Sequence, residues 1–224
     1  MNRLGLPAFR LIALAAVAGV LAGGLAVYVK AGLSGNMPEP TAVAGAPADA
    51  GRCLASAERA RTVAAAATGE VAAMLAADPS QPLSELAFNG PDGNPMRLAD
   101  LGNRVVLLNL WATWCAPCRA EMPALDALQA RMGGEAFEVV AVNVDTGDDE
   151  KPRKFLAETG VHNLAYYRDS TLALFNDLKR RSLALGLPVT LLIDRDGCLL
   201  AHMNGPAEWQ GPDARRLVEA ALGS

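Results

Sequence analysis

Residues 111–119, WATWCAPCR, constrain the fold more than any other stretch, because two cysteines two residues apart follow an apolar run and precede a helical pattern. The run Val105–Trp111 has the composition of a short, buried central strand. From Ala120 to Met132, apolar residues recur at helical spacing. We therefore expect Cys115 at the carboxyl end of a strand and at the start of a helix.

Two thiols at this spacing can close a small disulfide ring and reopen it, which indicates redox chemistry. Free N–H groups and the helix dipole favour a thiolate at Cys115, so we expect this sulfur to attack and Cys118 to resolve the mixed disulfide. Zinc is the competing use of the spacing, but it needs four ligands. The remaining candidates are isolated from one another, so no metal site and no cofactor are expected: Cys53, Cys198, His162 and His202.

Two further motifs carry a family resemblance. The motif WCxxC with Pro123 after it, together with Gly186–Thr190 before the apolar run 191–194, resembles a thioredoxin fold. The spelling WATWC followed by RAEMP resembles the TlpA/ResA branch of membrane-anchored bacterial thiol-disulfide oxidoreductases, over about residues 80–222. The resemblance implies that Pro188 is cis and lies against the active disulfide, where the preceding residue pairs with the substrate chain. A trans proline that opens a strand is the alternative.

Asn109 departs from the thioredoxin pattern, which has a buried aspartate six residues before the first cysteine. An amide cannot accept a proton at neutral pH, so Asn109 can support the site but cannot be its base. Glu121 matches a glutamate near the active site of ResA-like proteins and is our candidate proton acceptor for Cys118; an exposed helix glutamate is the alternative. We expect Trp111 and Trp114 to pack around the disulfide, and Trp209 to belong to the core.

The amino-terminal region predicts a membrane anchor. Leu11–Val29 contains 19 residues without a charge, long enough to cross a bilayer as a helix, and Arg3 and Arg10 precede it. A cleaved signal peptide is the competing interpretation, supported by small residues near the end of the run. The formal net charge of −4 argues against a nucleic-acid partner.

Composition then divides the chain. Ala31–Ala50 is rich in Gly, Pro and Ala, which predicts a tether, and Leu54–Ala77 predicts a helix or helix pair that packs through Val63, Val71, Met74 and Leu75. The expected organisation is a cytoplasmic amino terminus (1–10), a transmembrane anchor (11–29), a flexible linker (30–52), a helical extension (53–78) and a thioredoxin domain (79–224).

Alternating apolar and turn-rich segments predict the other elements. In order, these are an edge hairpin at 83–88 and 96–98, a strand at 137–144, a helix at 151–159, a strand at 164–167, a helix at 171–178, a hairpin of strands 189–193 and 198–203, and a helix at 212–222. Strand-helix alternation followed by a hairpin and a helix predicts an α/β sandwich around a mixed sheet.

Cys53 and Cys198 are the remaining cysteines. In an exported chain an even cysteine count favours pairing, so we expect a structural Cys53–Cys198 bridge buried between helix and sheet, with two separate thiols as the alternative. The Cys115–Cys118 pair, by contrast, is expected to be exposed.

The predicted function is that of a thiol-disulfide oxidoreductase, single-pass in the bacterial inner membrane with its domain in the periplasm. The resemblance implies a reductase that serves cytochrome c or cytochrome oxidase assembly. We expect a monomeric domain, with protein disulfides as substrates and a membrane thiol reductant upstream. Two alternatives remain: a copper-binding assembly protein that uses its thiols as soft ligands, and a DsbA-like oxidant.

Overall fold

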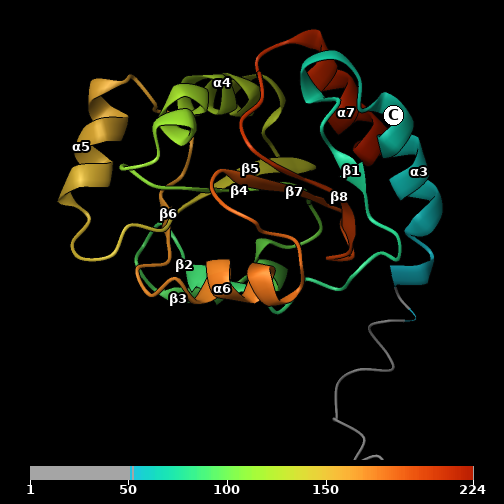
Figure 1. Cartoon of the computed structure of the whole chain (residues 1–224), viewed down its shortest axis with the longest axis horizontal. Coiled ribbons are helices and arrows are strands. Elements are labelled where there is room, and N and C mark those ends of the chain that lie inside the picture. The colour runs from blue at the N-terminus through green and yellow to red at the C-terminus, as the bar shows by residue number, and fades with distance from the viewer. Residues whose placement is uncertain (1–50, 52, 224) are drawn as a thin grey trace, which may run out of the picture. The chain divides into compact units, whose positions relative to one another are not determined.

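The computed structural model describes residues 51 and 53–223 and is built on an eight-stranded mixed sheet in the order β1-β8-β7-β4-β5-β6-β2-β3 (Figure 1). The strands are β1 (Leu75–Ala76), β2 (Ala87–Asn89), β3 (Pro95–Arg97), β4 (Val105–Trp111), β5 (Phe137–Asn143), β6 (Tyr167–Arg168), β7 (Val189–Ile193) and β8 (Leu199–Asn204). None of the described helices is long and apolar enough to cross a bilayer, and the predicted anchor at 11–29 lies outside the described residues.

Strand β4 occupies the centre of this sheet, as the apolar run predicted. All seven of its residues are buried, and so are all seven of β5, which runs parallel to it. On the other side β7 pairs antiparallel with β4, so that Leu110 lies opposite Val189. Strands covered on both faces can be apolar throughout, which explains why these segments show no alternation.

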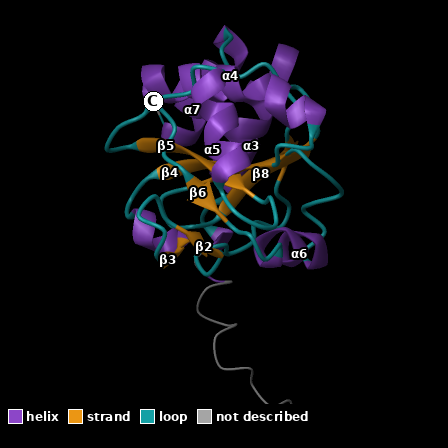
Figure 2. Ribbon diagram, turned by 90° about the vertical axis from the view of Figure 1, so that its left-hand side faces the viewer, coloured by secondary structure: helices purple, strands orange, loops and turns teal. Residues whose placement is uncertain are grey.

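Helices cover both faces of the sheet. Figures 1 and 2 show α3, α4 and α7 on one face and α6 on the other, with the β2–β3 hairpin on the α6 side. The helices are α3 (Ala57–Ala66), α4 (Ala116–Met132), α5 (Glu150–Glu158), α6 (Ala173–Arg180) and α7 (Pro212–Leu222), with short 3₁₀ turns η1 (Gly69–Val71) and η2 (Leu98–Leu101). This is the predicted α/β sandwich around a mixed sheet.

The segment from α3 to residue 77 corrects one expectation. Instead of a helix or helix pair to residue 77, α3 ends at Ala66, Gly69 follows with φ +56°, and Leu75–Ala76 form the edge strand β1 beside β8. A positive φ breaks a helix, and β8 offers free backbone groups that β1 pairs. Val63, Val71 and Met74 are buried as expected, but Leu75 is 61% exposed because it lies on the edge strand.

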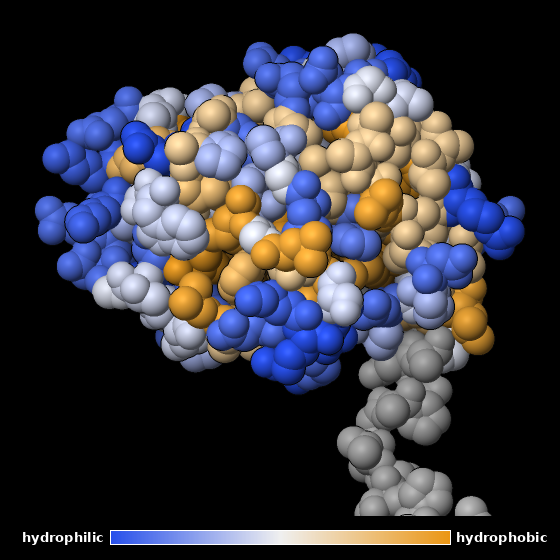
Figure 3. All heavy atoms as spheres, in the orientation of Figure 1, coloured by the Kyte–Doolittle hydropathy of each residue, from blue (hydrophilic) through white to orange (hydrophobic). Residues whose placement is uncertain are grey.

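The alanine-rich sequence of α3 leaves its outer surface only weakly apolar. Figure 3 shows pale orange spheres over the part of the face where Figure 1 draws α3 and α7. On its inner side α3 buries Ala60 and Val63. Most other elements match the predicted ones to within a few residues, but the edge hairpin is shifted to β2 and β3, and Leu83 and Leu86 are buried in the loop before it.

Candidate active site

The paired cysteines lie where β4 passes into α4. Cys115 is the N-cap of α4, with Ala116 and Pro117 in its first turn, and its Sγ atom accepts a hydrogen bond from the backbone N–H of Cys118 at 3.3 Å. A proline is tolerated in the first turn because its missing N–H would have no helical partner there. Cys115 and Cys118 are joined in a disulfide. The sulfur at the cap therefore accepts one otherwise unpaired N–H of the first turn and lies at the positive end of the helix dipole.

The disulfide is less accessible than expected. Cys115 is 5% exposed and Cys118 is fully buried, because the pair lies against the core rather than on an open surface. Trp111 is buried and contacts the ring of Phe155 from α5, with 5.6 Å between ring centroids. Trp114, which was expected to pack around the disulfide together with Trp111, precedes the helix on a turn and is 69% exposed.

Glu121 lies one turn beyond Cys118 on α4, and its side chain points inward. It is 3% exposed and accepts three hydrogen bonds. Its Oε1 atom accepts from Asn109 Nδ2 at 2.9 Å, and its Oε2 atom accepts from Trp209 Nε1 at 3.1 Å and from the Ala207 backbone N–H at 3.2 Å. The structure therefore rejects the exposed helix glutamate that was the alternative from sequence.

Burial raises the pKa of Glu121 to about 7, although its hydrogen bonds from Asn109, Trp209 and Ala207 act to lower it. At neutral pH this carboxyl can both hold and release a proton, which is what a proton acceptor requires. Asn109 is fully buried on β4, and its amide also donates to Thr190 Oγ1 of β7 at 3.0 Å. The Asn109 side chain thus ties Glu121 to the sheet.

Pro188 lies beside the same end of the sheet. The Leu187–Pro188 peptide bond is cis, and Val189, which follows it, pairs with Leu110 near the carboxyl end of β4. Since β4 leads directly to the disulfide, the pairing of β7 with β4 brings the cis-proline turn to the same end of these strands as Cys115. Pro188 itself is buried.

Sequence reasoning missed Asp145, which fixes the turn before the first cysteine. Its carboxylate accepts from the backbone N–H and the hydroxyl of Thr113, both at 2.9 Å, and from Asn143 Nδ2 at 2.7 Å. Arg168 of β6 holds the following loop by donating to the carbonyls of Gly147 and Asp148 at 2.6 and 2.9 Å. The signal available in the sequence was the polar run at the carboxyl end of β5, the parallel neighbour of β4.

Two cavities lie near opposite ends of β4. One of about 300 Å³ adjoins the active turn and is lined by Trp114, Asp148 and Lys151 among others. A larger one of about 440 Å³ lies at the opposite end of β4, where Val106 and Ile193 line it, and so is far along the strand from the disulfide. Within the described part of the chain, no group of three or more His, Cys, Asp or Glu side chains could hold a metal ion.

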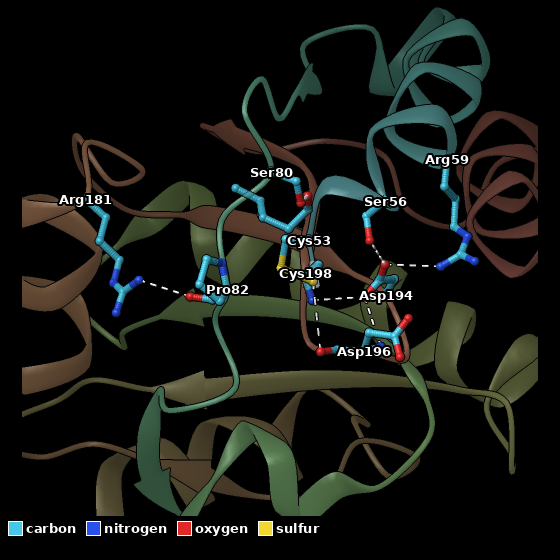
Figure 4. Close-up of a disulfide and its surroundings, with 10 residues drawn as sticks. Cys53, Ser56, Arg59, Ser80, Pro82, Arg181, Asp194, Asp196 and Cys198 are labelled. Carbon is cyan, nitrogen blue, oxygen red and sulfur yellow. Dashed lines mark hydrogen bonds and ion pairs between the residues drawn. A yellow bond between two sulfur atoms is a disulfide. The ribbon is translucent and has the colours of Figure 1, made fainter. Parts of the chain in front are cut away.

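The second disulfide joins Cys53 to Cys198, which are 145 residues apart in sequence (Figure 4). Both cysteines are buried. Ser56 and Arg59, from the turn before α3 and from α3 itself, point at the buried carboxylate of Asp194, with Oγ at 2.5 Å and Nη1 at 3.1 Å. Asp194 also accepts the backbone N–H of Cys198 at 2.9 Å. The bridge and this ion pair together fasten the α3 segment to the β7–β8 turn.

Comparisons with known proteins agree with this architecture. Thioredoxin-like protein YneN of Bacillus subtilis is 34% identical over 111 residues, which are 48% of this chain and 60% of that protein. Thiol-disulfide oxidoreductase ResA of Oceanobacillus iheyensis is 46% identical over 54 residues, 24% of this chain and 28% of that one. The matched parts thus span less than two thirds of these curated relatives.

A crystal structure described as a thiol:disulfide interchange protein DsbE from Chlorobium tepidum is 30% identical, with a TM-score of 0.55, and the match covers 64% of this chain and 97% of that one. The family model of the Redoxin family matches residues 47–220, well over half of the chain. The range matched by the family model includes both disulfides and all of the site described above. The chain therefore belongs to the Redoxin family and is a TlpA/ResA-like member of it with a thioredoxin fold.

Proposed function

We propose that this chain is a thiol-disulfide oxidoreductase that reduces disulfides in other proteins, with Cys115 as the attacking sulfur and Cys118 as the resolving one. The observation that carries the proposal is the disulfide at the amino terminus of α4, where a backbone N–H already points at Cys115 Sγ. A thiolate formed there gains the same hydrogen bond and the helix dipole. The names of the relatives YneN, ResA and DsbE support the same class.

The reaction balances in two steps. In the reduced protein, the Cys115 thiolate attacks one sulfur of a substrate disulfide; a Cys115–substrate bond forms, the substrate bond breaks, and the departing sulfur takes a proton. Cys118 then loses its proton to the Glu121 carboxylate and attacks Cys115 Sγ, which releases the second substrate sulfur. Two electrons pass from the two cysteines to the substrate, and the protein is left with its Cys115–Cys118 disulfide.

The test separates the two sulfurs. Cys115→Ser should abolish reduction of a model protein disulfide, whereas Cys118→Ser should accumulate a mixed disulfide through Cys115, seen as a covalent adduct by mass spectrometry. Alkylation of the reduced protein at about pH 6 should modify Cys115 before Cys118. Faster alkylation of Cys118 would reverse the two assignments, and full activity of Cys115→Ser would contradict the proposal itself.

We also propose that residues 11–29 anchor the protein in the inner membrane, that 30–52 tether the domain on the periplasmic side, and that 1–10 remain in the cytoplasm. The support is the uncharged run preceded by arginines and the resemblance to the TlpA/ResA branch. A reporter enzyme active only outside the cytoplasm, fused after residue 50, should be active and should sediment with membranes. A reporter that is released in soluble form would favour a cleaved signal peptide.

The proposed substrates are disulfides of cytochrome c or cytochrome oxidase assembly proteins, kept reduced at the expense of a membrane thiol reductant. The support is again the resemblance to that branch. Deletion of the gene in its host should lower the level of mature cytochrome c or cytochrome oxidase. A small permeant thiol should restore that level, because it can supply the electrons that the missing protein would otherwise deliver. A deletion phenotype cured by an oxidant would indicate an oxidase instead.

A further inference from the structure

Trp209 reaches the active site from a distant part of the chain. It lies in the loop between β8 and α7 and is fully buried, yet its indole does more than fill the core: Nε1 donates to Glu121 Oε2 at 3.1 Å. The same oxygen accepts the N–H of Ala207, two residues earlier, at 3.2 Å. One loop therefore supplies two donors to one carboxylate oxygen, while β4 supplies Asn109 to the other.

The partners that surround Glu121 in the structure are all neutral. Asn109 of β4, whose amide also donates to Thr190 of β7, presents an amide N–H to Glu121, and the 205–211 loop presents an indole and a backbone N–H. On α4, Cys118 lies one turn before Glu121 and is held in the disulfide, and no ion pair joins Glu121 to a described residue of this helix. Among the described residues no cation pairs with Glu121, so its charged form depends on hydrogen bonds alone.

We infer that Trp209 is a positioning residue of the active site, which acts by donating its indole N–H to Glu121 and thereby sets the pH at which this carboxyl exchanges its proton. The inference rests on the proposed function, in which Glu121 takes the proton of Cys118. A donor to a carboxylate stabilises the ionised form, so losing one of three donors must favour the protonated form. The buried indole thus changes the pH dependence of the second step of exchange, in which Cys118 loses its proton. None of its described contacts is with a cysteine sulfur.

The inference can be tested on the oxidised full chain, in which the active cysteines do not titrate. The indole proton resonance of Trp209, assigned by its loss in Trp209→Phe, should titrate with Glu121 at a midpoint of about 7. In Glu121→Gln the same resonance should not change with pH. If Trp209→Phe does not fold, the comparison of the wild type with Glu121→Gln still tests the inference. The indole proton resonance is then assigned through correlations with neighbouring protons.

Trp209→Phe itself keeps a buried ring and removes the donor. The side-chain carboxyl carbon of Glu121, followed by NMR, should then titrate about one pH unit higher than in the wild type. Trp111→Phe is the matched control, since Trp111 is a second buried tryptophan and no described contact joins it to Glu121. This variant should leave the Glu121 midpoint in place, whatever it does to packing.

Two results would overturn the inference: a Trp209 indole signal that stays constant while Glu121 titrates, or equal movement of the Glu121 midpoint in Trp209→Phe and Trp111→Phe. A separate measurement tests the proposed function. The rate at which Cys118 resolves a mixed disulfide should shift its pH dependence upward in Trp209→Phe by the same amount. A moved Glu121 midpoint with an unmoved rate profile would support Trp209 as the positioning residue and refute Glu121 as the proton acceptor.

Discussion

The two disulfides of this protein are both buried, yet their surroundings differ in the direction in which backbone N–H groups point. At the first pair, the N–H of Cys118 points to Cys115 Sγ at 3.3 Å. At the second pair, the N–H of Cys198 points away from sulfur, to the Asp194 carboxylate at 2.9 Å. Accessible area alone, 5% or less for all four cysteines, does not separate the two bonds.

The difference teaches that the environment of the product thiolate distinguishes a working disulfide from a structural one. Reducing Cys115–Cys118 leaves a sulfur with a donor in place and the positive end of α4 beside it. Reducing Cys53–Cys198 leaves buried sulfurs near the buried carboxylate of Asp194. The cation in this region, Arg59, is already paired with that carboxylate. Burial without donors disfavours a thiolate. We therefore expect only the first bond to exchange readily.

The sharpest way to break this comparison is stepwise reduction. Mild dithiothreitol on the native protein should free two thiols, mapped by mass spectrometry to Cys115 and Cys118, while Cys53–Cys198 stays intact. Denaturation with excess reductant should then free two more. Four free thiols in the native, untreated protein would remove the second bridge, and release of Cys53 before Cys115 would reverse the comparison.

Removing each bond should next affect stability unequally. Because Cys53 and Cys198 are 145 residues apart, the entropic model predicts that Cys53→Ser with Cys198→Ser lowers the free energy of unfolding by about 5 kcal/mol. The matched control, Cys115→Ser with Cys118→Ser, opens a loop with a separation of only 3 and should cost about 2 kcal/mol. Chemical denaturation of the two variants measures both values.

The variant that loses more stability should lose less exchange activity. The Cys53→Ser, Cys198→Ser protein should keep its exchange activity at temperatures where it remains folded, since no contact of this pair reaches Cys115. The control variant should have none. Loss of exchange in a folded Cys53→Ser, Cys198→Ser protein would give this bridge a redox role.

The two regions also differ in how each holds a buried carboxylate, which predicts a smaller effect. Asp194 is paired with Arg59, whereas Glu121 has only neutral donors, and burial raises the pKa of Glu121 to about 7. Between pH 4.5, the ordinary pKa of a glutamate, and about pH 7, Glu121 holds a proton in the folded protein that it releases in the unfolded chain. Stability contributed by protonated Glu121 is therefore lost as pH rises through this window, by about 3 kcal/mol.

Glu121→Gln should flatten that dependence, because a neutral amide does not titrate. Urea unfolding at about pH 5 and at about pH 8 should thus give a smaller difference in the free energy of unfolding for Glu121→Gln than for the wild type. Equal differences in the two proteins would contradict the raised pKa, because a carboxyl with a pKa at or below 4.5 is ionised across most of this window in both the folded and the unfolded state and adds almost no pH dependence there.

Much of the fold followed from patterns within short windows. The apolar run of β4, the helical spacing in α4 and the paired apolar runs at 189–193 and 198–203 each predicted its element, because local composition and period decide whether such a segment buries one face or both. The α3 segment was misjudged beyond Ala66. Its alanine content favours helix, but pairing with the free edge of β8 decided for the strand β1.

The sequence by itself determined the sulfur chemistry: which two cysteines form the short ring, that a helix starts at Cys115, and that Asn109 cannot act as a base. These properties depend on residue type and on spacings of a few residues. Tertiary structure alone decided what Glu121 and Trp209 do, since their contact joins residues 88 apart, and a pattern along one segment carries no information about such a partner. The same holds for Asp145 and Thr113, 32 residues apart. Burial and hydrogen bonding arise only when distant segments meet, and these are the forces that set the ionisation of Glu121.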